Sequence, residues 1–334
     1  PHNRTVVGEL KELVCRLRPD VAHVHNVFPM ISVGAYDVLC ALGVPVVQTV
    51  HNYRFLCPNG TFFVDGKVCE DCHIGNFRPC VGKKCMRGSR VVSHYYSKAI
   101  DYGWRKGIFA RAVTRFLALN EFTAQRLERA GVARTHIRIC PNFVAVPDNA
   151  VNYKESFALY LGRLSDEKGL WTLLEAVANL PDSFRLIIAG TGPQEVELRR
   201  HVESKLRGKV EVVGYVEGAK KLDLLRRAAC VVVPSEWYEN CPISVLEALA
   251  CGTAVVASSI GGLTELVHND ATGILFEPRS VAQLGTALLR YTEQPDLAAE
   301  HGAAAREFAC ENFSGEVHYR NLKAAYEDAC ACME

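Results

Sequence analysis

Residues 239–258, which read ENCPISVLEALACGTAVVAS, predict a loop, a short helix and a buried strand in succession. Pro242 stands near the expected start of the helix and Gly252 just after its end, which are positions that these two residue types favour. The run 254–258 is apolar almost throughout, as is typical of a strand covered on both faces of a sheet. The stretch therefore predicts one helix–strand unit of a parallel sheet.

The same alternation of apolar runs with helix-length segments extends along the rest of the chain. In the second half, the other predicted strands are 157–164, 185–189, 210–215 and 230–234. In the first half they are 21–26, 45–51, 115–120 and 137–142. Two such series predict an α/β protein with two Rossmann-like domains, each a parallel sheet with helices on both faces.

The boundaries of these domains follow from changes in composition. We expect a first domain at residues 1–145, a second at 156–315 and a C-terminal helix at 316–334 that crosses back to the first domain, with a polar linker across 143–156. A cysteine-rich insertion at 57–93 interrupts the first domain.

Length and composition narrow the class of protein. A chain of 334 residues exceeds the size at which one hydrophobic core usually stops growing, which favours two domains. Only 22% of residues are charged and the formal net charge is +1. The protein therefore has no strong overall electrostatic field that would attract nucleic acid or acidic lipid. No apolar run reaches the ~18 residues of a membrane span, and the amino terminus lacks a secretory signal pattern. The sequence therefore indicates a cytoplasmic protein.

Three loops at the C-terminal ends of predicted strands form a candidate site, because open parallel sheets bind ligands at that edge. The first holds two cations, Arg163 and Lys168, around a turn; the second reads GTGP at 190–193. The third leads into the helix quoted above, and the backbone near the helix start comes from Asn240, Cys241, Pro242 and Ile243. A guanidinium, an ammonium and free N–H groups at a helix start all bind phosphate, so the pattern predicts a diphosphate site.

Each of these features also has an ordinary explanation when taken singly. Arg163 and Lys168 could be solvated surface charges, and the glycines near 190 are a weak signal. Glu239 or Glu247 could cap or line a surface helix. It is their occurrence together, in this order of elements, that favours a ligand site.

With these motifs in place, the chain resembles the family 4 glycosyltransferases of the two-Rossmann-domain (GT-B) type, along essentially its whole length. Glu239 and Glu247 are similar to the family's paired glutamates, which are separated by seven residues. The segment YLGR at 160–163, continued to Lys168, resembles the family's diphosphate-binding loop. In that family the two domains face each other across a cleft.

The resemblance implies roles for the donor-side residues. Arg163 and Lys168 would hold the diphosphate of a nucleotide-sugar donor, Glu239 would contact the transferred sugar, and Glu247 would contact the ribose. The positions that fall where the family lines the base pocket are Gly214, Tyr215 and Val216.

The resemblance also implies residues of the first domain. His51, at the end of a predicted strand, is similar to the family histidine that approaches the sugar. Without this resemblance, His51 would be interpreted as an ordinary polar residue at a strand end whose hydrogen bonds are made within the protein. His25 is a weaker candidate for the acceptor side.

The activity implied is retaining transfer of a sugar from a nucleotide-diphosphate sugar to a saccharide or lipid-linked acceptor, in polysaccharide or envelope glycan synthesis. Bond breaking leaves negative charge on the diphosphate, and two fixed cations with a helix amino terminus can stabilise it without Mg²⁺. Transfer would then require no cofactor. Two alternatives stay open: a nucleotide-sugar epimerase or hydrolase, which needs no sugar acceptor, and a non-catalytic nucleotide-sugar-binding module.

One departure from the family concerns the amino terminus. Family members normally carry a strand, a glycine-rich loop and further units before the equivalent of Val21. We therefore expect a further segment before Pro1 in the whole protein.

The insertion holds five cysteines whose spacing permits several chemistries. Cys69, Cys72, Cys80 and Cys85 could form a structural zinc site, and Cys57 could replace one of them. Reduced thiols, a disulfide and an iron–sulfur site are the alternatives. The nine other cysteines are expected to be small buried apolar residues. A weak membrane contact is left open through four basic residues, Lys83, Lys84, Arg87 and Arg90.

Overall fold

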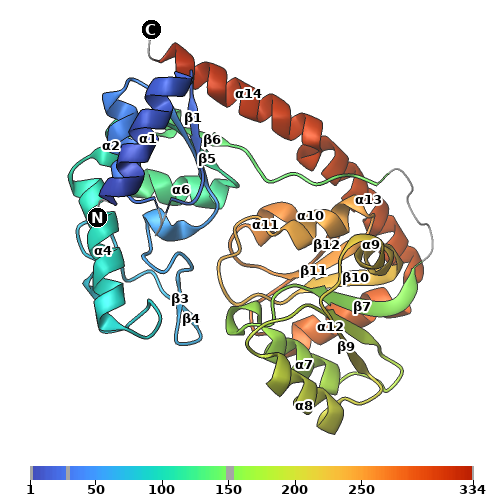
Figure 1. The fold of residues 1–334 in the computed structure, drawn as a ribbon. Helices are drawn as coiled ribbons and strands as arrows, with labels where there is room; N and C mark the ends of the chain where they lie inside the picture. Colours follow the sequence, from blue (N-terminus) through green and yellow to red (C-terminus); the bar gives the residue numbers. More distant parts are fainter. Residues whose placement is uncertain (1–2, 28–30, 148–153, 333–334) are drawn as a thin grey trace. The chain divides into compact units, whose positions relative to one another are not determined.

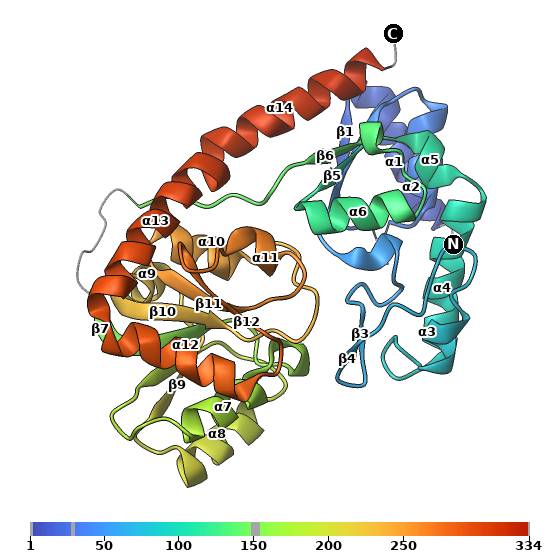
Figure 2. The same ribbon diagram turned by 180° about the vertical axis from the view of Figure 1, so that it is seen from behind.

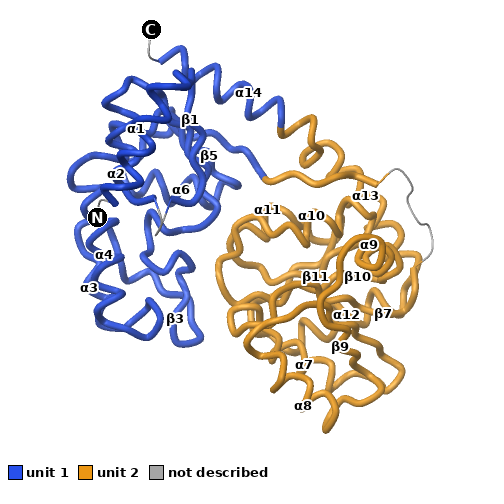
Figure 3. The backbone as a smooth tube through the Cα atoms, viewed as in Figure 1, with its two compact units in different colours: residues 1–141, 319–334 blue, residues 142–318 orange. Residues whose placement is uncertain are grey.

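A computed structural model describes residues 3–27, 31–147 and 154–332, and the chain divides into two units. Unit 1 comprises residues 1–141 and 319–334, and unit 2 comprises residues 142–318 (Figure 3). Each unit contains its own parallel sheet and helices (Figure 1). The predicted linker at 143–156 lies partly outside the described residues.

Unit 2 is built on a six-stranded sheet in the order β12-β11-β10-β7-β8-β9, with every described pairing parallel. Its strands are β7 (Glu155–Leu161), β8 (Leu186–Ala189), β9 (Val210–Gly214), β10 (Ala228–Val233), β11 (Ala254–Ser258) and β12 (Gly273–Phe276). Its helices are η3 (Asp166–Lys168), α7 (Leu170–Ala178), α8 (Glu195–Lys205), α9 (Gly218–Arg227), α10 (Ile243–Ala250), α11 (Leu263–Leu266), α12 (Val281–Glu293) and α13 (Pro295–Phe313). The sequence predicts the first five strands, whereas the four-residue β12 is found only in the structure.

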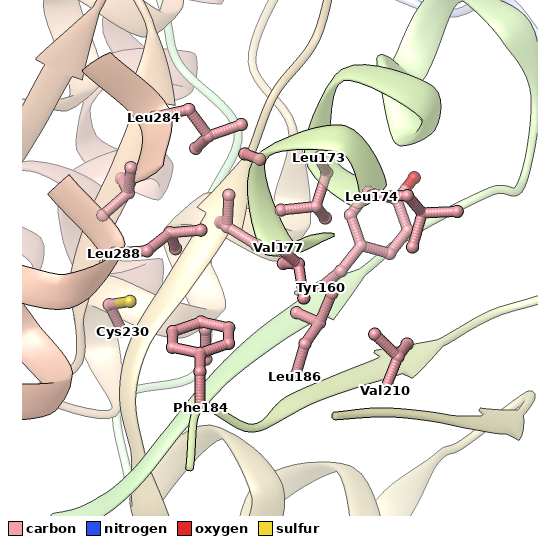
Figure 4. Packing of buried hydrophobic residues seen from close by; sticks show 14 of the residues in the cluster. Tyr160, Leu173, Leu174, Val177, Phe184, Leu186, Val210, Cys230, Leu284 and Leu288 are labelled. Atoms are coloured by element: carbon pink, nitrogen blue, oxygen red, sulfur yellow. The ribbon is translucent and has the colours of Figure 1, made fainter. Parts of the chain in front are cut away.

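The core of unit 2 explains why its strands read as continuous apolar runs. On one face of the sheet, Leu173 of α7 and Leu288 of α12 pack with Tyr160 of β7 in a single cluster (Figure 4). Leu159, the neighbour of Tyr160 on the strand, is fully buried as well. Since successive side chains of a strand point to opposite faces, β7 is covered on both. Helices α9 and α10 also contact strands of this sheet (Figures 1 and 2).

Unit 1 is built on a four-stranded parallel sheet in the order β1-β2-β5-β6. Its strands are β1 (Ala22–Val24), β2 (Val46–Val50), β5 (Val113–Ala118) and β6 (Ile137–Ile139). Its helices are α1 (Arg4–Leu17), α2 (Gly34–Ala41), α4 (Arg90–Arg105), α5 (Ile108–Ala112), α6 (Glu121–Arg129) and the short η2 (Arg134–His136). The α/β fold class with two parallel sheets, predicted from the sequence, is confirmed.

The C-terminal helix α14 (Gly315–Ala331) belongs to unit 1 from Tyr319 onward. Ala325 and Ala329 are fully buried there and pack with Val47, Leu117 and Cys140. Small side chains on this face let the helix lie close to strands β2 and β5.

The insertion contains little regular structure. It begins beside the helical turn η1 (Tyr53–Phe55) and forms an antiparallel ribbon of β3 (Phe63–Val64) and β4 (Lys67–Val68), followed by α3 (Arg78–Gly82). Its Phe62, Phe77 and Met86 side chains are nevertheless buried.

The nine cysteines outside the insertion do not share one environment. Cys140, Cys230, Cys241 and Cys251 are buried, as expected. The expectation is wrong for Cys15, Cys40, Cys310 and Cys332, which are exposed because they lie on outward faces of helices or beyond the end of α14. In the part of the chain that the structure describes, no helix combines the length and apolar character needed to cross a membrane.

Candidate functional site

The loops after β7 and β8 are joined by backbone hydrogen bonds. The N–H of Leu164 donates to the carbonyl of Thr191 at 2.9 Å, and the N–H of Gln194 donates to the carbonyl of Leu164 at 3.0 Å. The N–H of Gly162 donates to the carbonyl of Ala189 at 3.1 Å. The two loops therefore form one connected rim at the C-terminal edge of the sheet.

Two glycines let loops at this edge of the sheet approach one another closely. Gly190 has a φ of +148°, and a Cβ atom there would lie 1.8 Å from the carbonyl oxygen of Gly162. Gly169 has a φ of +68°, and a Cβ there would lie 1.9 Å from the carbonyl oxygen of Pro234. The glycine signal that was weak in the sequence thus has a physical cause, which is close approach of one loop backbone to another.

We predict that Gly190→Ala destabilises unit 2 by about 3 kcal/mol, because it adds both backbone strain and a clash with backbone atoms. Urea denaturation measures this free energy of unfolding. The matched control is Gly208→Ala, since Gly208 also has a positive φ of +86° but has open space where a Cβ would lie. That control should cost about 1 kcal/mol; equal losses in both variants would contradict the close-approach argument.

A cavity of about 630 Å³ opens beside this rim, entirely within unit 2. It is lined by the ends of β7 and β8, the residues after β9 and the first turn of α10, including Gly162, Arg163, Gly190, Thr191, Gly192, Tyr215, Val216, Lys221, Ile243, Ser244 and Glu247. Cavities of 300 to 1,000 Å³ are the usual size for small-molecule sites.

Arg163 is the cationic group of this cavity that has no ion pair among the described residues. Its side chain is exposed, and its backbone carbonyl accepts a hydrogen bond of 2.7 Å from the hydroxyl of Tyr160. Burial raises the pKa of Tyr160, so this hydroxyl remains a donor. The loop is fixed at Arg163 while the guanidinium stays available for an anion.

The start of α10 supplies backbone donors to the same cavity. Pro242 is the N-cap residue, and Ile243 and Ser244 of the first turn line the cavity. N–H groups in the first turn of a helix have no intrahelical acceptor, and they carry the positive end of the helix dipole. The arrangement can bind a phosphate group.

Lys168 and Glu239 contact each other. The Nζ atom of Lys168 lies 2.6 Å from Oε1 of Glu239, and the Ser235 hydroxyl donates to the same oxygen at 2.6 Å. The Glu239 side chain is only 5% exposed, so its charge is compensated in a place that water hardly reaches. Neither residue lines the cavity itself, and the sequence pattern did not predict that they form an ion pair.

Trp237 lies beside this ion pair and was not singled out from the sequence. Lys168 Nζ is 5.2 Å from the centroid of its ring. Its indole nitrogen is buried and has no hydrogen-bond partner within the described residues.

Lys221 is a second functional candidate that sequence reasoning missed. Its Nζ atom lies 2.6 Å from Oε1 of Glu247, and both residues line the cavity. Lys221 lies on α9 in the segment AKKL, where two lysines look like a solvated helix face. Only the fold shows which of them turns toward Glu247.

The other predicted donor-site residues lie near the cavity without all lining it. Val216 and Ile243 line it, whereas Gly214 ends β9 with a φ of +75°. Asn240 and Cys241 are buried in the preceding loop, and the Cys241 carbonyl accepts a hydrogen bond of 2.9 Å from the side chain of Asn142. The roles assigned to these residues stay predictions.

His51 and His25 both lie in unit 1, at the ends of β2 and β1. His25 Nδ1 is 2.7 Å from His51 Nε2. Burial lowers the pKa of both histidines, and the charge of His25 lowers that of His51 further. The structure thus brings the two histidine candidates together.

The thiols of the insertion lie near one another but each has a local partner. Cys69 Sγ is 3.2 Å from Lys83 Nζ, and the Cys57 thiol donates to the side chain of Asn59 at 2.9 Å. A hydrogen bond from Cys85 lowers the pKa of Cys80 to about 7. Across residues 3–27, 31–147 and 154–332, no group of three or more His, Cys, Asp or Glu side chains is arranged to hold a metal ion. The structure therefore does not form the zinc ligand set expected from the spacing.

Zinc at Cys69, Cys72, Cys80 and Cys85 thus stays a prediction of the sequence, and binding would require the Cys69 thiol to leave Lys83. Metal analysis of the purified chain tests it. A structural site predicts about one zinc per chain, lost in a Cys69→Ser/Cys72→Ser variant. A metal-free parent with reactive thiols would favour the reduced alternative.

Both halves of the chain match models of known protein families. Residues 1–146 match the family model described as Glycosyltransferase Family 4, and residues 145–308 match Glycosyl transferases group 1. A glycogen synthase of Mycobacterium tuberculosis is 38% identical over 169 residues, which cover 48% of this chain and 39% of that protein. The chain therefore spans well under half of the length of this relative. The alpha-D-kanosaminyltransferase of Streptomyces kanamyceticus is 30% identical over 263 residues, covering 77% of this chain and 63% of that protein.

Solved structures share the architecture at low sequence identity. Anabaena HepE in complex with UDP has a TM-score of 0.72 at 16% identity, covering 96% of this chain and 81% of that one. A sucrose-phosphate synthase from Thermosynechococcus elongatus has a TM-score of 0.70 at 19% identity, covering 99% and 80%. These likenesses show the fold, and the two family models together run from residue 1 to residue 308. The chain belongs to the family 4 (group 1) glycosyltransferases and has their GT-B fold.

Proposed function

We propose that this chain transfers a sugar from a nucleotide-diphosphate sugar to a saccharide or lipid-linked acceptor, with retention of anomeric configuration. The observation that carries the proposal is the cavity of unit 2, in which the unpaired guanidinium of Arg163 and the first turn of α10 meet the carboxylate of Glu247. The first two groups suit a diphosphate, and the carboxylate suits ribose hydroxyls.

The same groups account for the chemistry. As the bond between the sugar and the phosphate breaks, negative charge builds on the leaving diphosphate. In this proposal Arg163 and the helix start lie beside the leaving diphosphate before the bond breaks, so they need not reorganise during the reaction. Lys168, held by Glu239, would add a second cation once a donor competes for it, and Glu239 would then accept hydrogen bonds from the sugar. In this proposal the protein's own cationic groups stabilise the leaving diphosphate, so that no Mg²⁺ ion is needed for this purpose.

Location and partners are part of the proposal. A cytoplasmic location is proposed from the sequence, whose nine scattered cysteines do not have the pattern of a small secreted disulfide scaffold. Acceptors of polysaccharide or envelope glycan synthesis follow from the family alone. A weak membrane contact has less support, because Lys83 is already paired with Asp71 at 2.7 Å.

Product analysis tests the proposal. HepE was solved with UDP, so UDP-sugars are the first donors to supply, followed by GDP- and ADP-sugars, each with saccharide acceptors. Transfer predicts a glycosylated acceptor with the donor's anomeric configuration and one nucleoside diphosphate released per bond formed. An altered sugar still attached to the nucleotide would indicate an epimerase, and release without an acceptor would indicate a hydrolase. Binding without any product, in a folded sample, would indicate a binding module.

A further inference from the structure

The same dipeptide, His-Asn, follows two neighbouring parallel strands of unit 1. His25-Asn26 follows β1 and His51-Asn52 follows β2. His25 Nδ1 lies 2.7 Å from His51 Nε2, and the Asn52 amide donates to the Asn26 side-chain oxygen at 3.0 Å. Each residue of one dipeptide thus contacts its counterpart in the other, and the two strand ends are linked side chain to side chain.

The contact between the imidazoles limits their protonation. At 2.7 Å one ring nitrogen must donate a proton to the other, so the two rings cannot both be cations without two N–H groups facing each other. Burial lowers the pKa of both His25 and His51. The neutral pair has one N–H and one lone pair on its two outer nitrogens, His25 Nε2 and His51 Nδ1. Neither outer nitrogen has a hydrogen-bond partner in the described part of unit 1.

Buried groups hold the backbone of His25 in place. The side-chain amide of Gln48 donates to the His25 carbonyl at 2.8 Å, and the Tyr36 hydroxyl donates to the Gln48 side-chain oxygen at 2.5 Å. Gln48 and Tyr36 are both fully buried. The backbone at His25 is therefore held by two core residues, although the residue itself is exposed.

His23 fixes the other side of the pair. Its ring centroid lies 4.2 Å from that of His25, and its two nitrogens lie 2.7 Å from the hydroxyls of Thr49 and Tyr326. Tyr326 comes from α14, where burial raises its pKa and keeps it protonated. His23 and Tyr326 are thus the titratable groups packed around the histidine pair, from β1 and α14.

We propose that His25 is a positioning residue: it sets the tautomer and ring orientation of His51, so that the pair offers one donor and one acceptor to sugar hydroxyls. A sugar hydroxyl can both donate and accept, so it matches such a pair. A neutral pair also avoids repelling the positive charge that develops on a sugar ring during transfer. This role rests on the proposed function, whereas the coupling of the two rings does not.

An NMR titration of the histidine rings tests the coupling without any assay of activity. In His25→Gln the amide can still hydrogen-bond to His51 but cannot become a cation. His51 should therefore bind a proton about ten times more tightly than in the parent. His136→Gln is the matched control, because His136 is exposed and lies in the short helical turn η2 of the same unit. An unchanged titration of His51 in His25→Gln, in a folded sample, overturns the inference.

Kinetics then test positioning. With a donor and acceptor identified, His25→Ala should lower kcat about tenfold and change KM for the donor little, because the groups proposed to bind the donor's diphosphate and ribose lie in unit 2. His25→Gln should recover part of the loss, and His136→Ala should have no effect. A kcat equal to the parent's in His25→Ala overturns the positioning role. A parent chain that transfers nothing counts against the proposed function instead, and the NMR result stands apart from it.

Discussion

Arg163→Ala is expected to weaken binding of a nucleoside diphosphate about 10- to 100-fold. The reason is that the variant removes the cavity's unpaired guanidinium, and a hydrogen bond to a charged group contributes about 1.5–3 kcal/mol. Its effect on kcat/KM for transfer should be larger, about 100- to 1000-fold, because charge on the leaving diphosphate increases in the transition state. Calorimetric titration and initial-rate kinetics measure the two effects.

Two further variants sharpen this test. Arg163→Lys keeps the charge but not the forked geometry, so its binding should fall between that of the parent and that of Arg163→Ala. Arg200→Ala is the control, since Arg200 is an exposed arginine on α8 of the same unit and does not line the cavity. Equal binding by Arg163→Ala and Arg200→Ala would remove Arg163 from the site.

Lys168→Met is expected to reduce the stability of unit 2 by about 3 kcal/mol and to abolish most transfer. The substitution leaves the Glu239 carboxylate, which is 5% exposed, without its cation. Removing one partner of a buried ion pair costs about 3–5 kcal/mol, and the 20% exposure of Lys168 places the expected loss at the low end. Urea denaturation gives the stability and product release gives the rate.

The double variant Lys168→Met/Glu239→Gln separates the two roles. It removes both charges, so most of the lost stability should return. Transfer should stay at least 100-fold below that of the parent, because both groups proposed to contact the donor are gone. If the double variant were stable and as active as the parent, the ion pair would be only a structural element.

Much of this architecture was predictable because parallel strands covered on both faces are apolar throughout. That signal is strong in β10 and β11, which are buried along their whole length. It is weak in β12, which has four residues and starts with Gly273, where a Cβ would lie 2.1 Å from the Val255 carbonyl oxygen. A glycine and a short run look like a turn in the sequence, so this strand was missed.

Part of the candidate site was also predictable, because some of its residues belong to local sequence motifs. Arg163 and Glu247 stand at fixed distances from strand and helix ends, so the motif puts them at the cavity. Lys221 approaches Glu247 from another helix, and the Lys168–Glu239 contact joins two loops that are 71 residues apart. Such contacts depend on how helices and strands pack in three dimensions, so the spacing of residues along the sequence does not predict them. The repeated His-Asn dipeptide was visible in the sequence, but its meaning needed the pairing of β1 with β2.

The most direct test of the donor site is a calorimetric titration of the folded chain with UDP, GDP and ADP in the presence of EDTA. The account predicts that at least one of them binds with a stoichiometry of one per chain, and that Arg163→Ala binds the same nucleotide about 10- to 100-fold more weakly. Absence of binding by all three, with the chain shown to be folded in the same sample, would contradict the claim that unit 2 holds the donor through its own cationic groups.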